Sequence, residues 1–233
     1  LSYKFLPVNP VRIRGRRFDI PGGILNAMTF FLIIGLIEGA SHELPVRMII
    51  TGAVLLAVIG FFFVRRELRQ EYPLLPVDLL RIPVFSMSIS TSILSFTAQM
   101  LAMVSLPFFL QGELGKDAGL LLTPWPLATM IFAPLAGVLA ERINAGILGS
   151  IGLSIFACGL FLLSILSPDT GNGDIIWRMA LCGCGFGLFQ TPNNSTIVAS
   201  APRHRSGGAS GMLGTARLLG QTSGAALVAL MFR

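Results

Sequence analysis

The chain has 233 residues, of which 53% are hydrophobic and only 12% carry a charged side chain. Soluble globular domains hold roughly 25% charged residues, so this composition excludes an ordinary water-soluble fold. The net charge of +6 would indicate a nucleic-acid partner in a soluble protein, but the basic residues here lie between apolar runs, which excludes that partner.

The sequence contains seven apolar runs separated by short polar segments. Each is close to the length of about 20 residues that a helix needs to cross the hydrocarbon layer of a bilayer. A helix suits that layer because it satisfies its own backbone hydrogen bonds where water is absent. We therefore predict an all-α integral membrane protein, surrounded by lipid. In chain order the runs are Ile20 to Ala40, Val46 to Val64, Val84 to Leu110, Ala118 to Ala140, Gly146 to Leu166, Asp174 to Ser200 and Ser206 to Phe232.

Basic residues concentrate in alternate loops. Twelve of the seventeen precede the first run or follow the second, fourth and sixth runs. By the positive-inside rule these loops face the cytoplasm, so we predict a multi-pass protein of the inner (plasma) membrane with Leu1 inside. The twelve are Lys4, Arg12, Arg14, Arg16, Arg17, Arg65, Arg66, Arg69, Arg81, Arg142, Arg203 and Arg205.

Polar side chains form a stripe along the third run. Ser88, Ser92, Ser95 and Gln99 recur at a helical spacing and so share one face. Lipid would penalise this stripe, whereas a water-filled cavity would accept it. We predict that it faces the bundle interior and lines a substrate cavity.

The sixth run repeats that spacing with Gly183, Gly187, Gln190 and Asn194. Glycines permit close approach of two helices, and helix packing alone explains them. The amides of Gln190, Asn193 and Asn194 are predicted to line the cavity together with the serine stripe.

One charge falls in the middle of a predicted spanning helix. Arg217 lies eleven residues into the last run, which is about 16 Å along a helix and near the bilayer midplane. A charge there costs roughly 3 kcal/mol, so Arg217 needs a partner. Gln221 lies one turn further on the same face. Two interpretations stay open, a substrate or gating contact and a structural hydrogen-bond network.

The acidic residues follow a different pattern. All eleven lie in loops or near the ends of runs, so none is placed to carry a proton through the hydrocarbon core. A proton-driven protein would hold its coupling carboxylate in another part of a longer chain. The eleven are Asp19, Glu38, Glu43, Glu67, Glu71, Asp78, Glu113, Asp117, Glu141, Asp169 and Asp174.

Enzyme and cofactor signatures are not found in the sequence. It has no glycine-rich nucleotide loop and no His-Glu-x-x-His pattern. Cys158, Cys182 and Cys184 lie within apolar runs and lack the spacing of a metal site. We predict neither an enzyme, nor a metal, nor a cofactor.

The segment from Ala133 to Arg142 resembles the Gly-x-x-x-Asp/Arg loop signature of major facilitator transporters. Gly137, Glu141 and Arg142 fall at its motif positions, with Glu in place of the usual Asp. The resemblance implies a cytoplasmic loop motif at the end of the fourth run.

Further segments resemble the fourteen-helix drug:proton antiporter branch of that family, especially its methyl viologen and quaternary-ammonium exporters. They run from Gly183 to Asn194, from Arg205 to Gly211 and from Arg217 to Gly224. Arg17 to Gly22 resembles the start of the extra central helix pair of that branch.

The resemblance implies a major facilitator-type bundle that exports lipophilic or cationic drugs in exchange for protons, with substrate bound near the midplane. It divides the chain into a cytoplasmic loop (1–19), the central extra helix pair (20–66), a second cytoplasmic loop (67–83) and an incomplete carboxy-terminal bundle (84–233). The seven runs would be helices seven to thirteen of fourteen. The odd helix count and the first residue Leu also predict a fragment whose partner is the missing amino-terminal half.

Two alternatives remain. The same fold carries many substrates, so a metabolite or siderophore carrier is the second interpretation. A membrane sensor or assembly subunit that transports nothing is the third.

Overall fold

The structure is a computed structural model that describes residues 20–41, 45–67, 77–112, 118–167 and 169–232. The predicted cytoplasmic loop 1–19 and residues 68–76 of the predicted loop 67–83, with Arg69, lie outside this described part. Arg81 of the second loop is described and ends η1.

Every predicted run is helical, and the described residues contain no strand, which confirms the all-α fold class. The α-helices are α2 (Ile20–Ser41), α3 (Val46–Glu67), α4 (Pro83–Gly112), α5 (Ala118–Leu122), α6 (Pro124–Ala140), α7 (Ala145–Ser164), α8 (Asn172–Ser200) and α9 (Ser206–Met231). Two short 3-10 turns, η1 (Val77–Arg81) and η2 (Arg203–Arg205), precede α4 and α9.

The fourth run is the one that the structure divides. α5 ends at Leu122 and α6 begins at Pro124, with Thr123 as a turn between them. Proline has no backbone N–H, so Pro124 and Pro126 each remove a donor from the helix ladder. A proline is tolerated at the start of a helix, where its N–H would have no partner.

Four segments are long and apolar enough to cross a membrane by length and composition. They are α3, α4, the α5–α6 pair and α7. α8 and α9 are as long, at 29 and 26 residues, but include more glycine and polar side chains. The lower apolarity of α8 matches its place in the bundle, because α8 packs against more of the other helices than any other helix does.

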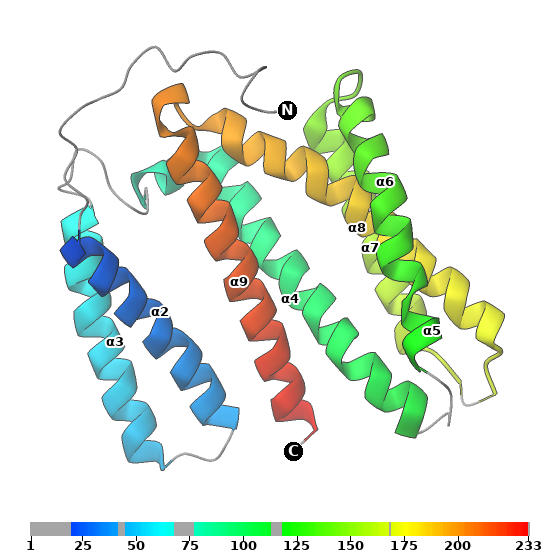
Figure 1. The fold of residues 1–233 in the computed structure, drawn as a ribbon, viewed down its shortest axis with the longest axis horizontal. Helices are drawn as coiled ribbons and strands as arrows, with labels where there is room; N and C mark the ends of the chain where they lie inside the picture. The colour runs from blue at the N-terminus through cyan, green and yellow to red at the C-terminus, as the bar shows by residue number, and fades with distance from the viewer. Residues whose placement is uncertain (1–19, 42–44, 68–76, 113–117, 168, 233) are drawn as a thin grey trace, which may run out of the picture.

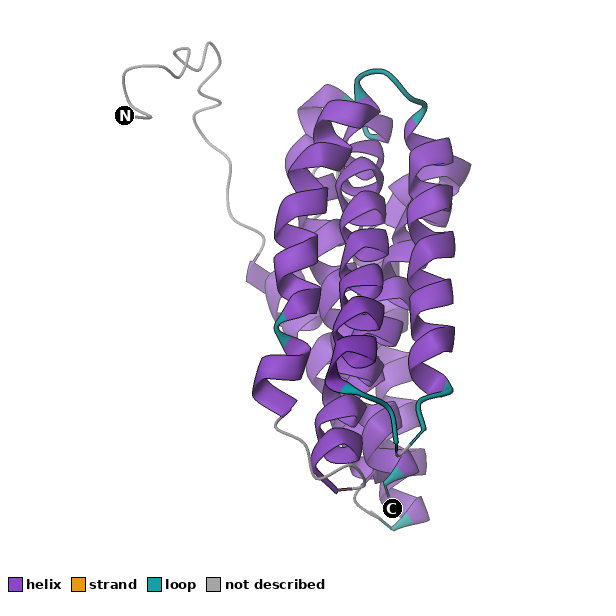
Figure 2. Cartoon of the chain, turned by 90° about the vertical axis from the view of Figure 1, so that its right-hand side faces the viewer, coloured by secondary structure: helices purple, strands orange, loops and turns teal. Residues whose placement is uncertain are grey.

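The helices stand side by side along one direction (Figures 1 and 2). α4 and α9 pack against each other in the middle, with the α2–α3 pair on one side and α6, α7 and α8 on the other (Figure 1). α8 lies against α4, α6 and α7, and it also touches α9. The α2–α3 pair meets the rest of the chain mainly through α2 and α9.

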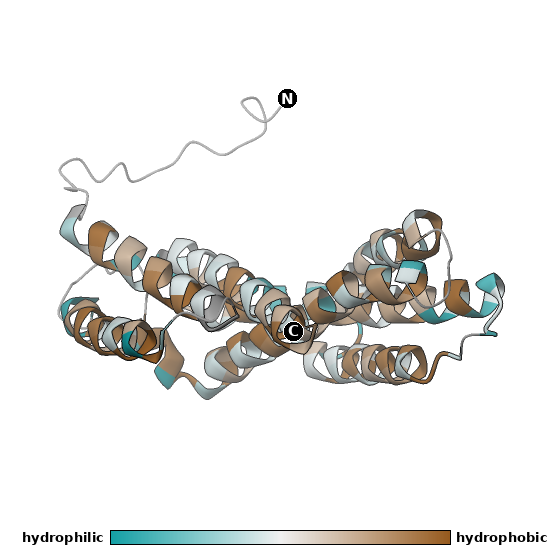
Figure 3. Cartoon of the chain, turned by 90° about the horizontal axis from the view of Figure 1, so that it is seen from below, coloured by the Kyte–Doolittle hydropathy of each residue, from teal (hydrophilic) through white to brown (hydrophobic). Residues whose placement is uncertain are grey.

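Much of each helix is made of apolar residues (Figure 3), and many of the large ones are exposed. Phe31, Leu120 and Met87 are among the large side chains that remain more than two thirds exposed. Such surfaces are expected where hydrocarbon, not water, surrounds the helix. The hydropathy of the surface therefore agrees with a chain that crosses a membrane many times.

Small residues bring α8 close to both of its outer neighbours. A Cβ added at Gly185 would lie 2.7 Å from the Gly152 carbonyl oxygen of α7, and one added at Gly183 would lie 2.9 Å from the Ala128 Cβ of α6. Thr191 also donates a 3.0 Å hydrogen bond from its hydroxyl to the Ala133 carbonyl of α6. The predicted close approach at the α8 glycines is confirmed.

A row of aromatic rings links four helices through the core. Phe96 of α4 meets Phe186 of α8, Phe186 meets Phe156 of α7, and Phe156 meets Trp125 of α6, all edge-on with ring centroids 5.5–5.6 Å apart. Edge-to-face pairs add about 0.5–1.5 kcal/mol each beyond their buried area. This aromatic row, defined by these four residues, joins the α6–α7–α8 group to α4.

The α4–α9 contact depends on Gly220 and Gly224. Cβ atoms added there would lie 2.6 Å from the Ile93 carbonyl oxygen and 2.5 Å from the Thr97 carbonyl oxygen. Backbone atoms cannot move aside as a side-chain tip can, so Gly220→Ala should lower the free energy of unfolding by about 1–3 kcal/mol. Thermal unfolding of the full-length protein in detergent measures this change.

Gly214→Ala is the matched control on the same helix, because nothing lies within 4 Å of an added Cβ there. It should leave stability unchanged or raise it by up to about 1 kcal/mol, since alanine favours helix. Equal effects of the two substitutions would contradict the proposed α4–α9 contact.

Candidate functional site

The polar stripe of α4 meets α8 at a single amide. Asn193 donates from Nδ2 to the Ser92 hydroxyl at 2.8 Å and to the Ser88 carbonyl oxygen at 3.3 Å. Ser92 and Ser95 are 1% and 4% exposed, and the Ser95 hydroxyl donates to the Ser92 carbonyl at 3.0 Å. Ser88 and Ser92 of the stripe therefore contact α8, and Ser95 is buried.

A proline stands next to Asn193 in α8. Pro192 is fully buried inside the helix and has no backbone N–H to donate. Thr196 donates its hydroxyl to the Pro192 carbonyl at 2.8 Å, and Asn193 reaches outward to α4. The proline inside α8 and the amide that reaches α4 are thus neighbours in the chain.

The three remaining residues predicted to line the cavity have fewer hydrogen bonds than Asn193 and Ser92. Gln99 on α4 and Gln190 and Asn194 on α8 are partly buried. Their side chains make no hydrogen bond to another residue in the described part of the chain. These three amides are polar groups inside the bundle that still have free hydrogen-bonding capacity for a ligand.

Arg217 lies on α9 beside the aromatic row. Its guanidinium carbon is 5.5 Å from the centroid of the Phe96 ring. The side chain is otherwise exposed in this chain, and Gln221 one turn later is partly buried. The Asn193 amide of α8 binds Ser92 of α4 rather than Arg217.

The loop motif closes α6 and leads into α7. Gly137 faces α8, since a Cβ there would lie 3.7 Å from the Thr191 methyl group. Glu141 is the C-cap residue of α6, and both Glu141 and Arg142 are exposed. Asn144 then caps α7 by accepting a 2.8 Å bond from the Gly146 N–H. The two charged motif residues are thus presented at one end of the bundle.

A charged pair joins the entries to α4 and α9 near that end. Arg205 of η2 contacts both carboxylate oxygens of Asp78 in η1, at 2.9 Å for one of the two bonds. A bidentate arginine–carboxylate contact fixes the orientation of the two side chains as well as the distance between them. The pair therefore ties together the starts of two helices that pack along their length.

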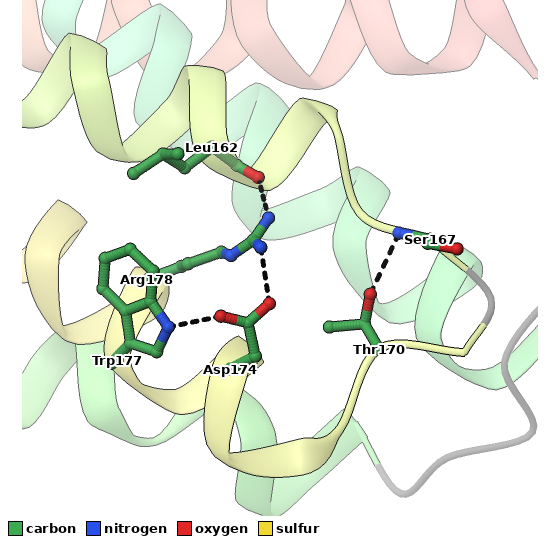
Figure 4. A network of polar contacts seen from close by, with 6 residues as sticks. All are labelled: Leu162, Ser167, Thr170, Asp174, Trp177 and Arg178. Carbon is green, nitrogen blue, oxygen red and sulfur yellow. Dashed lines mark hydrogen bonds and ion pairs between the residues drawn. The ribbon is translucent and has the colours of Figure 1, made fainter.

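A second polar network closes the other end, between α7 and α8 (Figure 4). Arg178 donates to the Leu162 carbonyl oxygen and pairs with Asp174, while the Trp177 ring N–H donates to the other Asp174 oxygen. The Leu162 carbonyl belongs to the last turn of α7, where carbonyls have no helical partner. Arg178 thus satisfies a helix end and links it to the start of α8.

The acidic residues of the described part all lie near helix ends or in loops. Glu38 lies in the last turn of α2, Glu67 ends α3, Asp78 lies in η1, Glu141 caps α6, Asp169 follows α7, and Asp174 begins α8. No group of three His, Cys, Asp or Glu residues in the described part is placed to hold a metal ion.

Two features of the site have weak signals in the sequence. The Asp174–Arg178 spacing of four residues is a recognisable helix ion pair, but its link to Leu162 depends on how α7 and α8 cross. The aromatic row has no spacing of its own, because its members come from four helices.

Known proteins similar to this chain are membrane transporters. The Major Facilitator Superfamily profile matches residues 18–225. Uncharacterized transporter YebQ of Escherichia coli K12 is 60% identical over 99% of this chain and 51% of its own length. Multidrug resistance protein Stp of Mycobacterium tuberculosis is 30% identical over 92% of this chain, which is 41% of its own length. Riboflavin transporter RibZ of Clostridioides difficile is 27% identical over 100% of this chain, which is 50% of its own length. The chain spans about half the length of the curated relatives it matches.

The α4–α8 contact predicts energetic coupling between Asn193 and Ser92. Asn193→Ala and Ser92→Ala should each destabilise the protein, and the double variant should cost less than their sum. Interhelical hydrogen bonds in membranes average about 0.6 kcal/mol and reach about 1.7, which sets the expected coupling. A double-mutant cycle by thermal or detergent unfolding measures it, and additivity would show that the contact does not form.

The α7–α8 network predicts a structural role for Arg178. Arg178→Gln removes both charge-assisted contacts and should lower the free energy of unfolding by about 1–3 kcal/mol. Arg47→Gln is the control, because Arg47 is exposed at the start of α3. A thermal-unfolding comparison in which both variants match the parent would rule out the network.

Proposed function

Because the chain belongs to the Major Facilitator Superfamily, we propose that it is half of a proton-coupled transporter that exports lipophilic or cationic drugs by alternating access. The family is one of transporters and not of enzymes, and the chain is a multi-pass membrane protein. The observation that carries the drug proposal is the similarity to a protein named for multidrug resistance over 92% of this chain.

The substrate cavity of this proposal is lined by α4 and α8. Gln99, Gln190 and Asn194 supply partly buried amides with no side-chain partner in the described residues, beside the Ser92–Asn193 bond. A few polar groups within an apolar wall orient a lipophilic ligand without excluding ligands of other shapes. Such a wall suits a transporter with several substrates.

The proposed orientation places Leu1 and the loop motif of Gly137, Glu141 and Arg142 in the cytoplasm, in the inner membrane of the cell. Arg65 and Arg66 at the end of α3 lie on the same predicted side and support it. Proton coupling would then use a carboxylate outside this chain, because the described acids lie at helix ends or in loops.

A metabolite carrier is the second candidate, and one comparison favours it. A protein named as a riboflavin transporter is 27% identical over the whole chain. The residues that line the proposed cavity are neutral amides and hydroxyls, which bind a polar ring system as readily as a drug.

Transport by the full-length protein in liposomes tests the function. With an imposed pH gradient, a lipophilic fluorescent cation such as ethidium should move against its own gradient, and a protonophore should abolish that movement. Movement of riboflavin but not of ethidium would favour the metabolite carrier. No gradient-dependent movement of either compound, in protein that is folded and correctly inserted, would contradict both proposals.

The cavity proposal predicts that Gln190→Ala and Asn194→Ala each reduce export. Losing one neutral hydrogen bond to the substrate costs about 1 kcal/mol, or roughly fivefold in the transport rate at low substrate concentration. Ser195→Ala is the control, because Ser195 is exposed on the same helix. Drug efflux from cells that express each variant at equal levels measures the effect, and unchanged efflux in both amide variants would remove them from the cavity.

A further inference from the structure

Arg217 is placed where a membrane helix rarely carries a charge. It lies eleven residues from the start and fourteen from the end of α9. In the described part of the chain it is the one charged side chain that lies at least ten residues from both ends of its helix. At the bilayer centre an uncompensated charge costs about 3 kcal/mol, so something must offset it.

The contacts within this chain do not offset it fully. The guanidinium lies over the ring of Phe96, which is 3% exposed and belongs to the aromatic row. A cation over a ring gains about 0.5–2 kcal/mol, which is less than the cost of the buried charge. The guanidinium also has five N–H donors, and a ring face accepts none of them as a full hydrogen bond.

Opposite charge near Arg217 is missing from the described residues. Their carboxylates all lie at helix ends or in loops, and Gln221 one turn away adds only a neutral amide. The residue is exposed in this chain, and its guanidinium donates no hydrogen bond to the described residues. The balancing group must therefore come from outside the described part.

We propose that Arg217 is an anion-binding site of the transport cavity, whose guanidinium takes a carboxylate while the Phe96 ring holds it in place. Its planar fork matches two carboxylate oxygens, which a point charge such as lysine does not. The proposal rests on the transport function proposed above and narrows its substrate class. Among lipophilic substrates this site would favour those that carry an acid group, and a cationic drug would bind elsewhere in the cavity.

Two sources can supply the carboxylate, a substrate with an acid group or an acidic side chain in the rest of the transporter. This chain covers about half of its relatives' length, so both are open to a test. The experiment uses full-length protein in lipid nanodiscs, with Arg217→Gln, Arg217→Lys and the control Leu218→Ala. Leu218 is the neighbouring exposed residue of α9, 62% accessible.

Dye binding tests the substrate source. The dissociation constants of fluorescein, an anion, and of ethidium, a cation, are measured by fluorescence anisotropy. If the substrate supplies the acid, Arg217→Gln weakens fluorescein binding at least about tenfold, because a charged hydrogen-bonded contact is lost. Arg217→Lys keeps part of the affinity, ethidium binding does not weaken, and Leu218→Ala matches the parent.

Thermal unfolding against pH tests the protein source. A carboxylate paired with Arg217 stabilises the fold while ionised, and that stability is lost as pH falls through the lowered pKa of the pair. The difference in Tm between the parent and Arg217→Gln should therefore be larger at pH 7 than at about pH 2, which lies well below the ordinary carboxyl pKa of about 4. Leu218→Ala should show no such dependence.

The two arms together decide the proposal. If Arg217→Gln changes fluorescein affinity by less than twofold and its Tm difference from the parent is independent of pH, Arg217 binds no carboxylate. Neither readout needs a gradient, so the result stands apart from the transport assay. A protein that transports ethidium normally but fails both arms keeps the proposed function and loses this site.

Discussion

A polar group inside a bilayer finds no water to bind, and this constraint explains the architecture of the chain. Each backbone N–H and C=O must be paired within the protein, so every spanning run is a helix. Some side chains follow the same rule, because Asn193 turns toward the α4 serines while large apolar residues such as Phe31 face outward. The exposed surface is therefore mainly apolar, with Arg217 as an exposed charge on α9.

α8 is the helix on which these arrangements converge. Its glycines admit α6 and α7 at backbone distance, its amide reaches α4, and Phe186 joins the aromatic row in both directions. Polar networks at the two ends, Arg178 with Asp174 and Arg205 with Asp78, link the helix starts and ends. The described part of the chain thus has tightly packed helices with a few neutral polar groups between them.

The helices could be predicted from the sequence because length and apolarity alone decide whether a segment crosses hydrocarbon. The break at Thr123 was not predicted, although Pro124 and Pro126 signalled it, because prolines are often tolerated inside membrane helices. The contact partners could not be predicted. Asn193 and Asn194 differ by about 100° around one helix, and only the crossing of α4 and α8 decides which of them meets Ser92.

Oxygen accessibility along α7 tests the central claim most directly. Nitroxide labels on the full-length protein in liposomes would report collision with oxygen, which dissolves in lipid, and with a water-soluble nickel complex. The structure predicts strong oxygen contact at Phe161 and Ile151, 65% and 47% exposed, and little at Phe156 and Leu163, 3% and 7% exposed. Strong nickel contact at Phe161, or equal oxygen contact at all four positions, would contradict a helix packed on α8 and surrounded by lipid.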